Sequence, residues 1–115
     1  MNPVIVIGLL FAHWVADFVC QTDYMALNKS KSLAILILHS IVYFTIICLG
    51  YEIIGFYEPY SFNMLFLLNL PAHFIIDMFS SNVTSYLWKR EKRHWFFVVI
   101  GFDQFLHYVV LFLTV

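Results

Sequence analysis

The amino-acid sequence predicts an all-α fold, a four-transmembrane-helix bundle that forms a single integral membrane domain over residues 1–115. Three observations predict it: the composition, four long apolar runs and the placement of the basic residues. Of the 115 residues, 63% are hydrophobic and only 11% are charged, whereas roughly 25% are charged in an average soluble domain. Six Lys/Arg and seven Asp/Glu are too few to cover the surface of so small a soluble protein. The composition therefore excludes a soluble globular domain, a disordered chain and a nucleic-acid-binding protein of the basic-patch type.

The four apolar runs set the expected helices, at about residues 3–21, 32–50, 60–80 and 95–114. Each run is close to the ~20 residues that a helix needs to cross the ~30 Å hydrocarbon core of a bilayer. Helices are expected because four strands could not close a barrel and lipid tolerates no open sheet edge. The chain starts without a basic segment or a cleavage site of small residues, so we interpret the first run as a retained span.

The basic residues set the expected orientation, because all six lie in two of the connections. These residues are Lys29 and Lys31 after the first run, and Lys89, Arg90, Lys92 and Arg93 after the third. The connection between the second and third runs carries Glu52 and Glu58 and no basic residue. The positive-inside rule then places both basic connections in the cytoplasm. Both termini are expected on the periplasmic or extracellular side of a bacterial inner membrane.

Seven ionisable side chains fall inside the apolar runs, where such a group is unfavourable unless it is paired or faces water. They are His13, Asp17, His39, His73, Asp77, Asp103 and His107. No Lys or Arg lies inside any run to neutralise the three carboxylates. Six of these residues form three i,i+4 pairs, which place both members of a pair on one helix face. Because the runs alternate in direction, the aspartate of every pair is expected nearer the cytoplasm.

The depths of these residues are also expected to agree. Counting 1.5 Å per residue from the expected cytoplasmic ends places Asp17 and Asp77 about 5 Å deep. The histidines of the first three runs come out about 10–12 Å deep, Asp103 about 12 Å and His107 about 18 Å. With some shift or tilt of the fourth helix, all four helices bring ligands to one layer of the cytoplasmic leaflet.

Metal binding by all seven residues is the favoured interpretation, because a divalent cation supplies the missing positive charge. The mixture of imidazole and carboxylate favours zinc, with manganese or iron as alternatives. Seven ligands exceed the three of a mononuclear catalytic zinc site, so the number of ions, one or two, stays open. The alternatives are His–Asp hydrogen bonds that tie the helices together and a haem held by two histidines, for which the aspartates have no use.

Polar residues beside this set are expected to serve a substrate. Gln21, Asp23 and Lys29 follow the first run and could hold a phosphate or an attacking water, and Gln104 neighbours Asp103. We expect Gln21, Lys29 and Gln104 to bind substrate. His39, Asp103 and Asp23 are the expected catalytic residues, with His39 either a ligand or a general base. Capping or interfacial placement is the alternative role of the residues after the first run.

Several motifs resemble those of a known family. The H-x3-D-F-x2-Q-T-D segment at residues 13–23 resembles the opening of a small bacterial and phage family of integral membrane proteins of uncharacterised function. His39, the H-F-x2-D segment at 73–77 and the D-Q-x2-H segment at 103–107 are similar to its later motifs, in the same order. More distantly, the His/Asp-rich helices are similar to inner-membrane metal-dependent hydrolases described as LexA-binding, which implies a hydrolase. The chain departs from the pattern at Ser80 and Ser81, where a lysine is expected.

Three functions stay open at this point. The favoured hypothesis is a membrane-embedded metal-dependent hydrolase that acts on a lipid or lipid-linked phosphate or ester in the cytoplasmic leaflet. The first alternative is a non-enzymatic membrane protein that uses the same residues to handle metal ions or protons. The second is a phage or accessory membrane protein that binds a partner. Membrane lipid is the expected partner, nucleic acid is not, and a homo-oligomer is possible.

Overall fold

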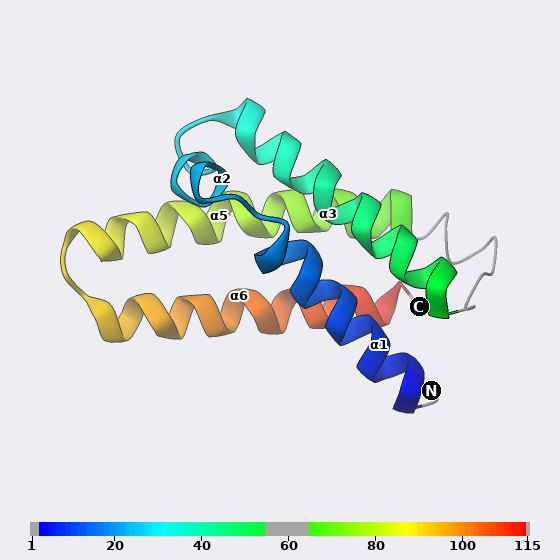
Figure 1. Ribbon diagram of the computed structural model, residues 1–115. Coiled ribbons are helices and arrows are strands. Elements are labelled where there is room, and N and C mark those ends of the chain that lie inside the picture. The colour runs from blue at the N-terminus through cyan, green and yellow to red at the C-terminus, as the bar shows by residue number, and fades with distance from the viewer. Residues whose placement is uncertain (1–2, 55–64, 115) are drawn as a thin grey trace.

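The computed structural model describes residues 3–54 and 65–114, and this part of the chain is built from helices and short turns without a strand (Figure 1). The elements, in chain order, are α1 (Pro3–Trp14), η1 (Val15–Val19), α2 (Asp23–Asn28), α3 (Leu33–Ile54), η2 (Leu65–Asn69), α5 (Leu70–Lys89) and α6 (Arg93–Leu113). The elements η1 and η2 are π-helical turns. The predicted all-α class is confirmed for these residues.

Among the described residues, two helices are long and apolar enough to cross a membrane, at Leu33–Ile53 and Arg93–Leu113. Pro3–Val19 forms a shorter apolar helix. The second and fourth apolar runs therefore form single helices, with ends shifted by a few residues from those predicted. A bundle with four spans stays a prediction.

The third apolar run forms the helix whose bounds differ most from those predicted. Residues 60–64 and Glu58 lie outside the described residues, and the helix that follows does not end at Ser80 but continues to Lys89. A helix ends where its backbone hydrogen bonds end, and the polar residues after Ser80 do not interrupt those bonds. Hydropathy alone therefore placed the end of this helix about two turns too early.

Helix α5 buries a polar face and exposes an apolar one. Its buried residues are His73, Asp77, Ser81 and Thr84. On the opposite side Ile75 and Phe79 are 49% and 65% exposed. Helix α6 repeats the arrangement, burying Asp103, His107 and Leu111 and exposing Phe97, Phe102 and Phe105. This is the reverse of a soluble amphipathic helix, and large exposed apolar faces of this kind indicate contact with a membrane or a partner.

Helices α5 and α6 form an antiparallel hairpin, α3 packs against α5, and α1 packs against α3 (Figure 1). The turn between the hairpin helices contains Glu91 in the left-handed region, with φ 59°. The short helix α2 packs against α3. Thr22 caps the start of α2, since its Oγ1 accepts a hydrogen bond from Met25 N at 3.2 Å.

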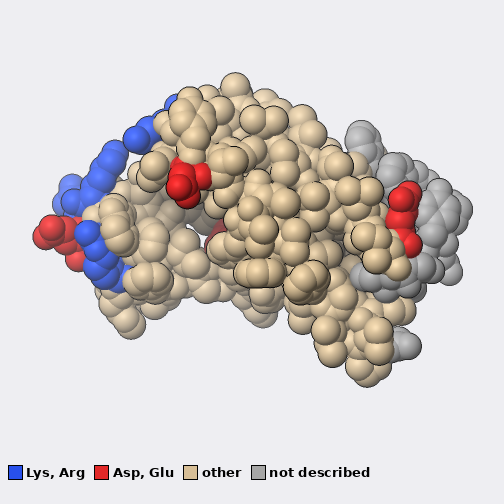
Figure 2. Space-filling model, in the orientation of Figure 1, with Lys and Arg blue, Asp and Glu red and all other residues tan. Residues whose placement is uncertain are grey.

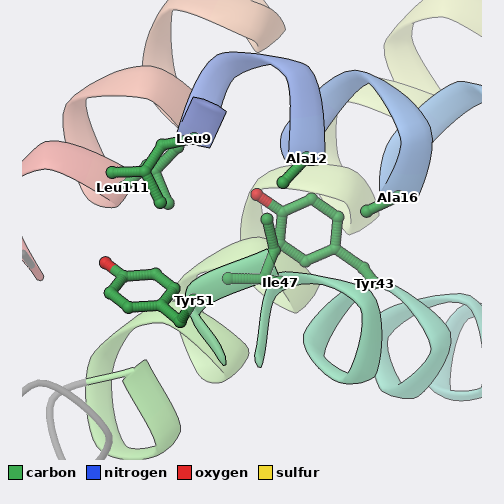
Figure 3. Packing of buried hydrophobic residues seen from close by; sticks show 7 residues of the cluster. All are labelled: Leu9, Ala12, Ala16, Tyr43, Ile47, Tyr51 and Leu111. Atoms are coloured by element: carbon green, nitrogen blue, oxygen red, sulfur yellow. The ribbon is translucent and has the colours of Figure 1, made fainter. Parts of the chain in front are cut away.

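An apolar cluster holds α1, α3 and α6 together (Figure 3). Its members are Leu9, Ala12, Ala16, Tyr43, Ile47, Tyr51 and Leu111. Helices α1 and α3 cross closely within it, because a Cβ atom on Gly50 would lie 2.8 Å from Ala12 Cβ. Small residues at helix crossings permit such an approach. The cluster fixes α1 against α3 beside the polar residues that follow on both helices.

Candidate metal centre

A π-helical turn carries Asp17 into the interior. Over Val15–Val19 the helix widens, and Cys20 N donates a hydrogen bond to Val15 O at 2.8 Å. Such turns are rare and often occur at functional sites. Asp17 is 4% exposed and lies directly after Ala16 of the apolar cluster.

A second π-helical turn leads into α5, where Pro71 follows it closely. A proline ring clashes with the carbonyl four residues earlier in a regular α-helix and supplies no N–H, so a wider turn accommodates it. Asn69, at the end of this turn, is 2% exposed. It begins the buried polar face on which His73 and Asp77 follow at i+4 spacing.

Four buried side chains bring ligand atoms together at the centre of the molecule: Asp17, His39, His73 and Asp77. His39 Nε2 lies 3.1 Å from Asp17 Oδ1 and 2.9 Å from Asp77 Oδ2. His73 Nε2 lies 3.9 Å and 3.4 Å from the same two oxygens. A tetrahedral ion with ligands about 2.0–2.1 Å away separates neighbouring ligand atoms by about 3.3 Å. These four imidazole–carboxylate distances are therefore close to those of a tetrahedral metal site.

The hydrogen bonds of His73 fit a metal ligand. Its Nε2 is buried and makes no hydrogen bond to any described residue, although it faces two carboxylates. Its Nδ1 lies 3.3 Å from His107 Nδ1, and His107 Nε2 lies 3.0 Å from Asp77 Oδ1. If His107 Nε2–H donates to Asp77, then His107 Nδ1 accepts from His73 Nδ1–H. This tautomer leaves a lone pair on His73 Nε2, as metal ligation requires.

A second group of possible ligands, Asp17, Asp103 and His107, adjoins the first and shares Asp17 with it. Gln104 joins its carboxylates, because Gln104 Nε2 donates to Asp17 Oδ2 at 3.1 Å and to Asp103 Oδ2 at 3.0 Å. His107 Nε2 lies 3.4 Å from Asp103 Oδ2. Asp17 therefore directs one oxygen toward each group.

His13 has a different environment from the other histidines. Its Nε2 donates to Gln104 Oε1 at 2.7 Å, and its Nδ1 accepts from the Tyr43 hydroxyl at 2.8 Å. Both ring nitrogens are therefore engaged, and His13 belongs to neither group of possible ligands. In this arrangement His13 positions Gln104, and the sequence did not indicate this role of His13.

Lys29 corrects the expectation that no basic residue neutralises the carboxylates. Its Nζ donates to Asp77 Oδ2 at 3.3 Å, and its side chain is only 17% exposed. The expectation was wrong because it considered only the apolar runs. Lys29 follows α2, and its long flexible stem reaches back to α5. One ammonium group balances one carboxylate and leaves two of the three.

A cavity of about 420 Å³ adjoins the two groups of possible ligands, on the side where the basic residues lie. Asp17, Asp103 and Gln104 line it, as do Gln21 and Lys29. Figure 2 shows the Lys and Arg side chains gathered at one end of the molecule, with a hollow between that end and the rest. The ligand groups therefore have a route to the surface.

The structure brings most of the predicted site residues together but not all of them. Asp23 is exposed at the start of α2 and is not among the residues that line the cavity. Two contributors were missed. Ser80 Oγ donates to Asp103 Oδ1 at 2.5 Å, and the Tyr43 ring stacks on His73 with 3.8 Å between centroids. The i+4 spacing of Tyr43 from His39 was the available signal.

Because α5 is longer than predicted, the expected difference in depth between Asp77 and Asp103 disappears. Asp77 lies about three turns before the end of α5, and Asp103 lies about three turns after the start of α6. The two aspartates therefore stand at similar heights in the hairpin. Asp103 was expected deeper than Asp77 because the third helix was ended at Ser80.

Comparison with known proteins gives one match. A family model described as "Protein of unknown function (DUF3307)" matches residues 5–115. No curated protein and no solved structure matches the chain. The matched range includes every predicted ligand.

Proposed function

The chain belongs to a family of proteins of unknown function, DUF3307, and we propose that it is a membrane-embedded, metal-dependent hydrolase. The observation that carries the proposal is the group formed by Asp17, His39, His73 and Asp77. Its four facing atoms are 2.9–3.9 Å apart in the contacts between imidazoles and carboxylates. His73 Nε2 makes no hydrogen bond to any described residue, so its lone pair is available to an ion.

Charge supports the same assignment. Among the described residues, Asp17, Asp77 and Asp103 are three buried carboxylates, and the ion pairs with lysine reach only Asp77, from Lys29. Two negative charges then lack a cationic partner unless histidines are protonated, and buried uncompensated charge is strongly unfavourable. A divalent ion balances both charges. Zinc suits the two-imidazole, two-carboxylate set, and manganese or iron are alternatives.

The second group extends the proposal to one or two ions. Asp17, Asp103 and His107 would hold a second ion, with Asp17 as the bridge, provided that the amide of Gln104 moves aside. A metal ion supplies Lewis-acid activation of water and of a phosphoryl or acyl oxygen. If a single ion is bound, Asp103, which lines the cavity, is the candidate general base, and the Ser80 hydroxyl donates to its Oδ1. Gln21, Gln104 and Lys29 are the candidate substrate contacts.

We place the protein in a bacterial inner membrane as four spans, with the basic end in the cytoplasm and both termini outside. The apolar faces of α5 and α6 and the basic residues at one end support this placement (Figure 2). The cavity adjoins that basic end, so the proposed substrate is a membrane lipid or a lipid-linked phosphate or ester in the cytoplasmic leaflet. A homo-oligomer is compatible with the exposed apolar faces.

Metal content and metal-dependent stability test the proposal without knowledge of the substrate. The protein is purified in detergent, stripped with a chelator, reloaded with zinc and examined by elemental analysis and thermal denaturation. We expect bound zinc and a higher melting temperature in the wild type, and neither in Asp77→Asn or His73→Gln, because these changes remove ligands.

Glu52→Gln is the matched control, since Glu52 is an exposed carboxylate on α3 away from the group. It should keep the zinc and the shift in melting temperature. Zinc retained by the folded Asp77→Asn and His73→Gln variants would refute the ligand assignment. A wild type without metal-dependent stabilisation would refute the metal centre altogether.

A second candidate function is ion or proton handling. The observation that favours it is the buried polar face of η2 and α5, which runs from Asn69 through His73, Asp77 and Ser81 to Thr84 over about four turns. Buried Asp/His series of this kind serve as proton relays. Metal or proton uptake into liposomes that contain the purified protein would favour this function over hydrolysis.

A further inference from the structure

The cavity beside the candidate metal centre combines a basic rim with an acidic floor. Lys29, Lys31 and Lys89 line it together with Asp17 and Asp103. Since the two carboxylates belong to the ligand groups, the basic residues are the charges that remain for a ligand in the cavity. An anionic ligand is therefore favoured over a neutral or cationic one.

Two polar groups on the cavity wall lack a partner among the described residues. Ser81 Oγ is unbonded although the residue is only 7% exposed. Gln21 Oε1 is likewise buried and unbonded. Both residues line the cavity. Buried polar atoms are nearly always hydrogen-bonded, so unbonded ones in a cavity wall indicate a ligand or water that completes them.

A phosphate group matches these two atoms and the basic rim together. Its oxygens accept from the Ser81 hydroxyl and from lysine ammonium groups, which form strong charge-assisted hydrogen bonds. A phosphate monoester carries about −1.5 to −2 charges near neutral pH, so it retains a P–OH part of the time. That hydroxyl can donate to Gln21 Oε1. A carboxylic ester offers neither the charge nor the donor.

Apolar residues complete the cavity, and several of them face outward. Phe18, Leu27 and Trp88 line it and are 45%, 68% and 49% exposed. The cavity thus joins an anion-binding wall to an apolar surface. This combination fits an amphiphile whose chain stays in lipid while its anionic end enters the cavity.

We propose that the cavity binds the terminal phosphate of a phosphomonoester or diphosphate amphiphile, held by Lys31, Lys89 and Ser81 beside the metal centre. This inference rests on the proposed hydrolase function and narrows its substrate from phosphate or ester to a terminal phosphate. Lys31 and Lys89 act as binding residues, and neither belongs to the ligand groups.

Trp88 provides a direct readout of binding because it lines the cavity, whereas Trp14 and Trp95 do not. A Trp14→Phe/Trp95→Phe background leaves Trp88 as the single tryptophan. The protein is placed in phosphatidylcholine nanodiscs and titrated with inorganic phosphate. In a parallel arm, the nanodiscs contain phosphatidic acid, and phosphatidylcholine alone is the blank. Each titration is made with chelator and again with zinc.

We expect Trp88 emission to change with phosphatidic acid and not with phosphatidylcholine alone. Lys31→Ala/Lys89→Ala should weaken binding about tenfold and Ser81→Ala about threefold, since each removes a contact to an anionic group. Arg90→Ala/Lys92→Ala is the matched control for the loss of two charges, because Arg90 and Lys92 lie in the basic turn after α5 but do not line the cavity. Ser40→Ala is the control for a buried hydroxyl, since Ser40 Oγ donates to Leu36 O instead.

The outcomes separate this inference from the metal centre. Zinc binding without any response to phosphatidic acid or inorganic phosphate would overturn the inference and leave the metal centre standing. Phosphate binding in a protein that takes up no zinc would support the inference and refute the hydrolase. Equal loss of binding in Arg90→Ala/Lys92→Ala and in Lys31→Ala/Lys89→Ala would overturn it, because the attraction would then be unspecific. A response to inorganic phosphate as strong as that to phosphatidic acid would leave a phosphate site but overturn the amphiphile as its ligand.

Discussion

Two buried regions meet at Tyr43, and they are held together in different ways. The apolar cluster around Leu9, Ile47 and Leu111 is held by contacts between apolar surfaces (Figure 3). The central group of Asp17, His39, His73 and Asp77 is buried to a similar extent but contains charges and two ring nitrogens, His39 Nδ1 and His73 Nε2, without a hydrogen bond to any described residue. Tyr43 packs in the first region and donates to His13 beside the second.

The apolar cluster is stable by its own packing, whereas the central group needs an added ion. Van der Waals contact holds the apolar cluster whether or not an ion is present, and this is the contribution that remains between helices in lipid. The central group, taken with the adjoining Asp103, has three carboxylates and one ammonium group, that of Lys29. Its stability therefore depends on what occupies the space between its ligand atoms, and the two regions should respond differently to metal.

The largest expected effect is in the apolar cluster. Ile47→Ala should lower the free energy of unfolding by about 2–5 kcal/mol, because Ile47 is fully buried and its truncation leaves a cavity. The loss should be the same with zinc and with chelator, as measured by thermal denaturation in detergent. Ile53→Ala on the same helix is the control, since Ile53 is 85% exposed and should have little effect. A loss that depends on zinc would show that the stability of the apolar cluster is not independent of the metal centre.

Removal of metal from the wild type comes next in size. A ligand present at 100 times its Kd stabilises the folded state by about 2.7 kcal/mol, so chelation should cost a similar amount. Asp17→Asn should lose this metal-dependent part because Asp17 belongs to both ligand groups. The check is a zinc titration of the unfolding free energy. If Asp17→Asn gained as much from zinc as the wild type, Asp17 would be a hydrogen-bonding residue only.

The smallest expected loss of stability is at Tyr43, where the apolar cluster meets the central group. Tyr43→Phe keeps the ring that stacks on His73 and removes the hydroxyl that donates to His13. We expect a loss of about 1 kcal/mol, the usual net contribution of one buried hydrogen bond. Tyr24→Phe, at an exposed position, controls for loss of a hydroxyl. A loss several times larger would show that His13, through Gln104, supports the whole central group.

The sequence was sufficient to predict which residues are buried with the carboxylates, for a physical reason that applies to each. His73 and Asp77 lie one turn apart in an apolar run, and such groups must face the interior rather than lipid. The same reasoning located Asp103 and His107 on α6. It failed for Lys29 and Ser80, because neither lies deep in an apolar run and their contacts join distant elements.

By itself, the sequence determined the helical class, the two long apolar helices and the inward placement of the aspartates and histidines, since these follow from local hydropathy and helical spacing. Only the tertiary structure decided the roles within the group. It engaged both nitrogens of His13, left His73 Nε2 unbonded and brought Lys29 to Asp77. Those outcomes depend on how helices cross and where a helix ends, as the continuation of α5 to Lys89 illustrates. Spacing along one helix cannot encode distances between helices, and it is these distances that determine which atoms can share an ion.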